Sequence, residues 1–192
     1  MRLALATHNP HKQREFARLM PNQALEALPD PVALPPEEGT TFAENALDKA
    51  RAAARGTGRP AVADDSGIEA EALGGGPGVR SARYAGEQAS DAENLAKLMR
   101  EAPAGSRLTY VCALAFVDPA TEEERVFYGR CHGRLAAQAR GKGGFGYDPA
   151  FVPDDDGSGA TMAELSAAQK DSISHRGRAA RALVAWLAER AP

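Results

Sequence analysis

The sequence predicts an α/β protein with a mixed, twisted central sheet flanked by helices. Three observations lead to this fold class. Short apolar segments that read as strands alternate along the chain with segments of helical periodicity. Two helices are marked by capping boxes, one at Thr41 and Glu44 and the other at Ser90 and Glu93. One hairpin stands in the middle of the chain, so antiparallel pairing is expected beside the parallel pairs.

The first half of the chain reads as strand, polar loop, helix, irregular segment, helix and strand. The first helix is indicated by Phe16, Leu19 and Met20 at helical spacing, and the second is expected to end at Gly56. These elements occupy residues 2–6, 7–12, 13–20, 29–39, 41–56 and 60–63, in that order.

The second half begins with a glycine-rich turn and ends in two helices. Residues 107–117 are apolar on both alternating faces, which is typical of a central strand. The last helix has an apolar stripe of Leu183, Trp186 and Leu187. The expected elements are a turn at 74–78, a helix after Ser90, strands at 107–117 and 125–135, a loop-rich segment at 140–160, and helices at 161–168 and 175–190.

Composition and charge exclude several classes of protein. The 192 residues carry a net charge of −3, which gives no electrostatic footprint for duplex nucleic acid. No apolar run approaches the roughly 18 residues of a membrane-spanning helix, and the apolar N-terminal run is too short for a signal peptide. The two cysteines, Cys112 and Cys131, are expected to be buried and inert. We therefore expect a single domain over residues 1–192 in a soluble cytoplasmic protein without nucleic-acid or membrane partners.

Two adjacent acids, Asp64 and Asp65, end the short apolar run in AVADDSG. If the extended geometry persists, their side chains point to opposite faces, so only one of them can enter a given site. Taken alone, the stretch favours a solvated turn, because Asp, Ser and Gly are common turn formers. Glu37 and Glu38, in the loop before the capped helix, offer further oxygen ligands of the kind that Mg²⁺ uses, or simply complement the helix dipole.

Three other segments offer ligand contacts. THNPHK, residues 7–12, can bind phosphate through backbone N–H groups and side chains, although it lacks the P-loop pattern. GGFGYD, residues 143–148, sets Phe145 and Tyr147 among glycines, where either ring can stack on a base or pack inward. KDSISHRGR, residues 170–178, gathers cations at a helix start, where they oppose the helix dipole unless an anion also binds.

Six segments together resemble one family. THNPHK, EEGTTFAENA, ADDSG, GGGPGVRSARYAG, GGFGYDPAF and KDSISHRGRA occur in this order from residue 7 to residue 179. In this combination they resemble the Ham1/RdgB family of inosine triphosphate pyrophosphatases over nearly the whole chain. The resemblance implies hydrolysis of the non-standard purine nucleotides ITP, dITP and XTP to the monophosphate and pyrophosphate, with Mg²⁺ as cofactor. It also implies two lobes around an active-site cleft and a homodimer.

The resemblance also implies site residues. Asp65 matches the metal-linked catalytic acid, and Glu37 is the preferred second metal ligand. Many relatives read EETGxTF where this chain reads EEGTTF, one residue shorter, which leaves Glu38 as the alternative. The positions that match substrate contacts are Thr7, His8, Asn9, Pro10, His11, Lys12, Ser66, Phe145, Gly146, Tyr147, Asp148, Lys170, His175 and Arg176.

The expected reaction is attack of water on a phosphoryl group with pyrophosphate leaving. Asp65 is either the acceptor of the water's proton or only a metal ligand. The chain has no Cys or Ser in a nucleophile–base motif, so no covalent intermediate is expected. Preference for ITP over ATP requires donors toward the 6-keto group, from His175, Arg176 or backbone N–H groups near 145–148. Two alternatives stay open: a Maf-like pyrophosphatase acting on other modified nucleotides, and a nucleotide-binding module without catalysis.

Overall fold

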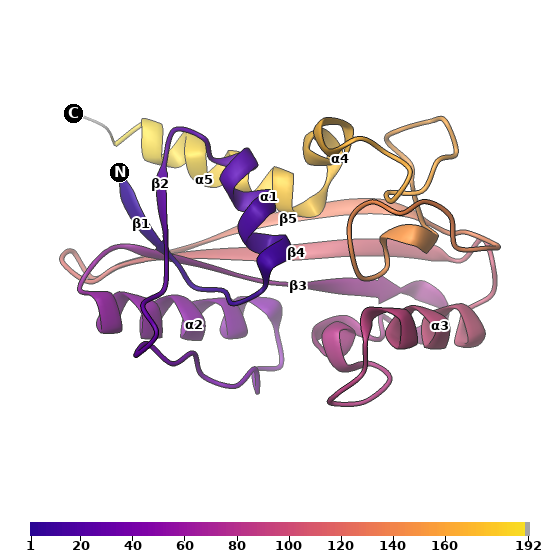
Figure 1. The fold of residues 1–192 in the computed structure, drawn as a ribbon, viewed down its shortest axis with the longest axis horizontal. Coiled ribbons are helices and arrows are strands. Elements are labelled where there is room, and N and C mark those ends of the chain that lie inside the picture. The colour runs from indigo at the N-terminus through magenta and orange to yellow at the C-terminus, as the bar shows by residue number, and fades with distance from the viewer. Residues whose placement is uncertain (191–192) are drawn as a thin grey trace. The chain divides into compact units, whose positions relative to one another are not determined.

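The computed structural model describes residues 1–190 and contains both helices and strands in alternation (Figure 1). The strands are β1 (Arg2–Leu5), β2 (Ala24–Ala27), β3 (Ala61–Ala70), β4 (Arg107–Asp118), β5 (Glu123–Leu135) and β6 (Phe151–Pro153). The helices are α1 (Pro10–Leu19), α2 (Phe42–Thr57), α3 (Asp91–Glu101), α4 (Ala167–Ile173) and α5 (His175–Ala188). No helix within residues 1–190 is both long enough and apolar enough to cross a membrane.

All six strands belong to one sheet, in the order β2-β1-β3-β4-β5-β6. Strand β1 pairs in parallel with both β2 and β3, and Leu5 stands opposite Val62 in the second of these pairs. Strand β5 pairs with β6 in antiparallel fashion. The sheet is therefore mixed, and the predicted fold class, a mixed sheet with flanking helices, is confirmed.

The chain divides into two compact units, and each has its own apolar core. Unit 1 comprises residues 1–65, 112–129 and 176–192, and unit 2 comprises residues 66–111 and 130–175. Strands β3, β4 and β5 each contribute residues to both units. Two of the four boundaries, between Asp65 and Ser66 and between His175 and Arg176, cut through motifs found in the sequence.

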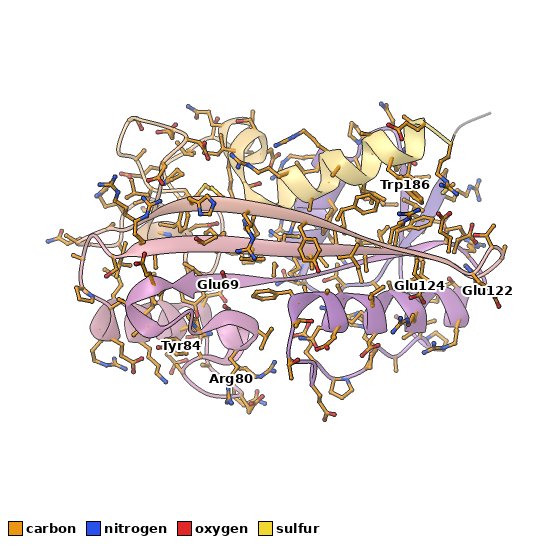
Figure 2. All side chains as sticks on the ribbon, turned by 180° about the vertical axis from the view of Figure 1, so that it is seen from behind. Glu69, Arg80, Tyr84, Glu122, Glu124 and Trp186 are labelled. Atoms are coloured by element: carbon orange, nitrogen blue, oxygen red, sulfur yellow. The ribbon has the colours of Figure 1, made fainter. Side chains whose placement is uncertain are left out.

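In unit 1, helix α2 covers one face of the strands, and α1 and α5 cover the other (Figure 1). Alternation along β1 sends Leu3 and Leu5 to the same core cluster as Phe16 of α1 and Leu183 of α5. Trp186 of α5, labelled in Figure 2, packs edge-on against Phe116 of β4 with 5.1 Å between the ring centroids. Two helical layers thus enclose the strands of this unit.

In unit 2, the core is formed around residues from β3, β4, β5 and α3. Ile68, Leu98, Leu108 and Phe151 are almost completely buried in it. Helix α3 begins at the predicted capping box, in which the Ser90 hydroxyl accepts from the Glu93 amide and the Glu93 carboxylate accepts from the Ser90 amide. Such a cap contributes about 1 kcal/mol to helix stability. The predicted helix start is confirmed.

Several element boundaries differ from the predictions. Strand β3 does not end at the acidic pair but runs on to Ala70, because residues 66–70 are also held in the sheet. Helix α1 begins at Pro10, three residues earlier than predicted, since proline fits the first helical position, where its missing N–H is not needed. Helix α2 ends not at Gly56 but at Thr57, with Gly58 in the left-handed conformation behind it.

Two short strands and one helix were also misassigned. Strand β2 was not predicted, and β6 lies inside the segment predicted to be loop-rich. A helix at 161–168 is wrong: a helix forms instead at Ala167–Ile173, where Ser166 and Gln169 make a capping box. The two cysteines are buried and free as expected, and burial raises the pKa of the Cys112 thiol to about 12.

Candidate active site

The two adjacent acids lie within β3 and point to opposite faces of unit 1. The extended backbone of β3 continues through Asp64 and Asp65, so their side chains alternate. Asp64 meets side chains from α1 and α5, whereas Asp65 meets side chains from α2. Both are buried, with 1% and 4% of their surface exposed. The adjacent charges are therefore separated by the strand itself and have different partners.

Asp64 is the centre of a buried charge network. Its Oδ1 lies 3.0 Å from Nζ of Lys12, and its Oδ2 accepts from Nη2 and Nε of Arg176 at 3.1 and 3.3 Å. The same guanidinium donates through Nη1 to Glu15 at 2.5 Å. Cations and anions thus alternate from Lys12 through Asp64 and Arg176 to Glu15. This chain of contacts ties the first turns of α1 and α5 to the middle of β3.

The network fixes the ionisation of Asp64. Burial by itself would raise the pKa of this carboxyl, but the charges of Lys12, Arg176 and Lys49 outweigh burial and hold the pKa well below its usual range. Asp64 is therefore a carboxylate at neutral pH. Arg176 also stands at the start of α5, where a cation opposes the helix dipole, and the compensating anions are the protein's own Asp64 and Glu15.

Asp65 has a different environment on the other face. Nδ2 of Asn45 donates to its Oδ2 at 2.9 Å, and Nζ of Lys49 lies 3.7 Å from its Oδ1. Burial raises the pKa of Asp65 above its usual value, and nearby Glu37 adds to this rise, while Lys49 and Asn45 oppose it. Two neighbouring carboxyls therefore have pKa values pushed in opposite directions, which is the pattern that separates a proton acceptor from a structural charge.

Glu37 and Lys49 complete the face around Asp65. Nζ of Lys49 donates to Oε1 of Glu37 at 2.5 Å and to the backbone carbonyl of Asp64 at 2.8 Å. Although burial acts to lower it, the pKa of Lys49 is raised by Asp65, Glu37 and Asp64. Glu38, in contrast, is exposed. Of the two acids in this loop, Glu37 is therefore the one that lies near Asp65.

The carboxylates of Glu37 and Asp65 fit Mg²⁺ in their chemistry. Both approach one cationic atom, Nζ of Lys49, so their oxygens converge on a common position. Residues 1–190 contain no group of three or more His, Cys, Asp or Glu arranged to hold a metal. Mg²⁺ is commonly held by one or two carboxylates, with water and substrate phosphate completing the octahedron, so two carboxylates suffice.

The segment THNPHK forms a loop that enters α1. Asn9 is the N-cap, and its Oδ1 accepts from the amides of His11 and Lys12 at 2.8 and 3.3 Å. The amide of Asn9 itself donates to the buried Thr7 hydroxyl at 3.2 Å. Most of the predicted backbone donors therefore already have an internal acceptor. Within this segment His8 and His11 are exposed and Lys12 is partly exposed, so these are the side chains that a phosphate can reach directly.

In unit 2, Asp148 organises the second group of predicted site residues. Its buried carboxylate accepts from Nζ of Lys170 at 2.6 Å, from the Tyr110 hydroxyl at 3.1 Å and from the Phe145 amide at 2.9 Å. A Cβ at Gly144 would lie 1.9 Å from Oδ2 of Asp148, and the φ of Gly144 is +68°, so this turn requires glycine. The glycine-rich loop is thus folded around a carboxylate.

The two aromatic side chains of the loop differ in exposure. Tyr147 belongs to the buried core of unit 2 and donates its hydroxyl proton to the Ser81 carbonyl at 2.7 Å. Phe145 is partly exposed and lies under Nζ of Lys170, 5.2 Å from the ring centroid. Phe145 is therefore the ring of this loop that a flat ligand can reach. The Gly146 amide donates to Oδ2 of Asp91 at 2.9 Å.

His175 and Ser66 stand at the unit boundaries. The His175 ring is buried and stacks on Tyr110, with 4.5 Å between centroids and 7° between planes. Ser66 follows Asp65 directly in β3 and is partly exposed. In unit 1 the structure brings Lys12, Glu37 and Arg176 together around the acid pair Asp64 and Asp65. In unit 2 it brings together Phe145, Asp148, Lys170 and His175.

Four residues of these clusters were missed in the sequence: Glu15, Asn45, Lys49 and Tyr110. Asn45 bridges two parts of unit 1, because its Oδ1 accepts from the Gly39 amide at 2.7 Å while its Nδ2 holds Asp65. A signal for Asn45 and Lys49 was present. They fall, four residues apart, on the stripe of α2 that is otherwise apolar and buried. A buried polar pair on an otherwise apolar stripe is the signal by which the sequence offered these two residues as candidates.

The fold and the site define a mixed α/β protein in which buried carboxylates are flanked by lysines. The chain belongs to the Ham1 family, whose sequence profile matches residues 3–186.

Relatives match over nearly their whole length. A dITP/XTP pyrophosphatase of Frankia alni is 48% identical, with 98% of each chain covered. One from Cutibacterium acnes is 47% identical, with 95% of this chain and 94% of that protein covered. Among solved structures, a HAM1 protein from Coxiella burnetii superposes with a TM-score of 0.87 at 37% identity, covering 98% of this chain and 99% of that one.

Proposed function

We propose that this chain hydrolyses non-standard purine nucleoside triphosphates, namely ITP, dITP and XTP, to the nucleoside monophosphate and pyrophosphate. Family membership and the names of full-length relatives support the activity. The single observation that carries the chemistry is the acid pair of β3. Asp65 has a raised pKa beside a second carboxylate and a lysine, whereas Asp64 has a lowered pKa and is held by two cations. Because the two pKa values are shifted in opposite directions, Asp65 can accept a proton while Asp64 keeps its negative charge.

We infer that Asp65 accepts the proton of the attacking water. The water oxygen forms a bond to the α-phosphorus, the bond from that phosphorus to the bridging oxygen breaks, and pyrophosphate leaves with the electron pair. A base with a raised pKa is better matched to neutral pH than an ordinary carboxylate. Asn45, which donates to Oδ2, orients the carboxylate for this task.

We propose Glu37 and Asp65 as the protein ligands of Mg²⁺. Their convergence on Nζ of Lys49 supports this choice, and the exposure of Glu38 favours Glu37 over it. When bound, Mg²⁺ supplies charge neutralisation on phosphate oxygens and lowers the pKa of a coordinated water. Lys12 is the proposed contact of the phosphate tail, since its Nζ is partly exposed while Asp64 holds it in place. The contacts of Arg176 support a role in fixing Asp64.

Recognition of the purine is assigned to unit 2. Phe145 is partly exposed, and Lys170 offers an ammonium that donates to a keto oxygen but not to the amino group of adenine. The amides of Phe145 and Gly146 already have carboxylate acceptors, which leaves side chains as the better donors. A site built to hydrogen-bond the substrate rejects the mismatched analogue by up to about 10⁴–10⁵-fold.

A substrate panel tests the proposal. Purified protein with Mg²⁺ is given ITP, dITP, XTP, GTP, ATP and pyrimidine triphosphates, and release of pyrophosphate and monophosphate is measured. We expect kcat/KM to be highest for ITP, dITP and XTP. Best turnover of a pyrimidine triphosphate would point to a Maf-like activity, and ITP binding without release would point to a binding module. Omitting Mg²⁺ in a parallel series tests the metal requirement, and sedimentation of the same sample tests the predicted homodimer.

A further inference from the structure

Lys49 occupies the position on which the proposed metal ligands converge. Its Nζ donates to Oε1 of Glu37 at 2.5 Å, donates to the Asp64 carbonyl at 2.8 Å and lies 3.7 Å from Oδ1 of Asp65. An ammonium has three N–H donors and no acceptor; two of them make these hydrogen bonds, and the Asp65 carboxylate is an ion-pair partner beyond hydrogen-bonding distance. Only 8% of the Lys49 side chain is exposed. The Lys49 ammonium is therefore buried and held in this position by its contacts.

An ammonium and a divalent cation compete for such a position. The Glu37 and Asp65 oxygens that point at Nζ are the atoms that a metal would need, and the two cations repel each other at contact distance. The stem of Lys49 comes from the middle of α2, on its buried face, so the ammonium cannot swing freely into solvent. In the nucleotide-free protein the lysine thus acts as the internal counter-ion of the two carboxylates.

We propose that Lys49 holds the metal position closed in the nucleotide-free protein, so that the divalent cation binds tightly only together with the triphosphate. The inference rests on the proposed function, because the triphosphate is what changes the charge balance. Its phosphate oxygens give the ammonium a new acceptor and give the metal further ligands, so both cations are accommodated at once. The contacts of Lys49 thus prevent a metal ion from occupying Glu37 and Asp65 before the substrate binds.

Metal binding in the absence of nucleotide tests the inference. Mn²⁺ binding to the metal-free full chain is followed by electron paramagnetic resonance, and the dissociation constant is measured for wild type and for Lys49→Met, whose side chain is unbranched and neutral. We expect wild type to bind Mn²⁺ no more tightly than about 1 mM, and Lys49→Met to bind it at least about tenfold more tightly. A merely structural role of Lys49 predicts unchanged or weaker metal binding.

The matched control is Lys97→Met. Lys97 is likewise a lysine on a helix, partly buried rather than buried, and its Nζ donates to the Tyr84 carbonyl at 2.9 Å, away from Glu37 and Asp65. This variant is expected to bind Mn²⁺ as wild type does. Lys49→Gln serves as a second variant if Lys49→Met does not fold, as judged by circular dichroism.

Two results would overturn the inference. One is micromolar Mn²⁺ binding by nucleotide-free wild type, which needs no variant. The other is an unchanged or weaker Mn²⁺ affinity in a folded Lys49 variant. Neither depends on turnover, so they are distinguishable from a failure of the proposed function, which would appear as wild-type protein that does not hydrolyse dITP or XTP.

Discussion

Replacement of Asp64 by Asn is expected to destabilise the protein strongly, whereas the same change at Asp65 is not. Asp64 is 1% exposed, forms an ion pair with Lys12 and accepts twice from Arg176. An amide of the same shape removes one negative charge, so the buried network of two cations and two anions acquires an excess positive charge. The amide NH₂ also faces a cationic donor. Leaving a buried charge without its partner costs about 3–5 kcal/mol.

That free energy corresponds to a fall in melting temperature of about 6–20 °C for a chain of this size. Asp65→Asn is the matched control, because it makes the same chemical change at the next residue. The raised pKa of Asp65 means that its surroundings disfavour the charged form, so removal of the charge is expected to cost less than about 1 kcal/mol. Turnover should show the reverse order, with Asp65→Asn inactive and Asp64→Asn partly active.

The effect has a defined pH dependence. The pKa of Asp64 is lower in the folded protein than in the unfolded chain, so its stabilising contribution is fully present above the unfolded value of about 3.9. That contribution is lost as the pH falls further, through the folded pKa. The difference in unfolding free energy between wild type and Asp64→Asn is therefore expected to be constant near neutral pH and to shrink below about pH 4.

Thermal and urea unfolding, followed by circular dichroism, measure both variants, and pyrophosphate release measures their turnover of dITP. Equal melting temperatures for the two variants would refute the assignment of Asp64 to the charge network. Equal loss of turnover with unchanged stability would refute the division of labour between the two acids.

Four further predictions concern the acid limb of activity, a helix residue, a loop glycine and purine selectivity. Because the pKa of Asp65 is raised, kcat/KM should fall with decreasing pH above the ordinary carboxyl range of about 4; a limb lying below that range in a pH profile would contradict its role as base. Asn45→Ala should lower metal-dependent turnover about 10–100-fold while the protein stays folded; unchanged kcat/KM would show that Asp65 needs no support from α2. Gly144→Ala should cost more than about 1 kcal/mol in urea unfolding, since φ is +68° and the new Cβ collides with Asp148; a stability equal to wild type would refute the close packing of this turn. Lys170→Met should reduce the ratio of kcat/KM for ITP over ATP at least about tenfold, and an unchanged ratio would exclude it as the donor to the 6-keto oxygen.

Local signals in the sequence were sufficient for most of the elements. Capping boxes at Thr41 and Ser90 start α2 and α3 where predicted, and the apolar run at 107–117 became β4. The short strands β2 and β6 were missed because β2, ALEA, has no β-branched or aromatic residue and β6, FVP, spans three residues and ends in proline. Boundaries set by tertiary contacts, such as the extension of β3 to Ala70, were also beyond local reasoning.

For the acid pair, one property could be predicted from the sequence and another is determined only by the tertiary structure. Adjacency on a strand was enough to predict that Asp64 and Asp65 face opposite ways, because side chains alternate along any extended backbone. Which of the two faces a pair of cations and which faces Asn45 and Lys49 depends on the helices that cover each face. The Asp64–Arg176 contact joins residues 112 apart, and the Glu15–Arg176 contact joins residues 161 apart. Since no local pattern links such positions, only the folded chain assigns a fixed charge to Asp64 and a raised pKa to Asp65.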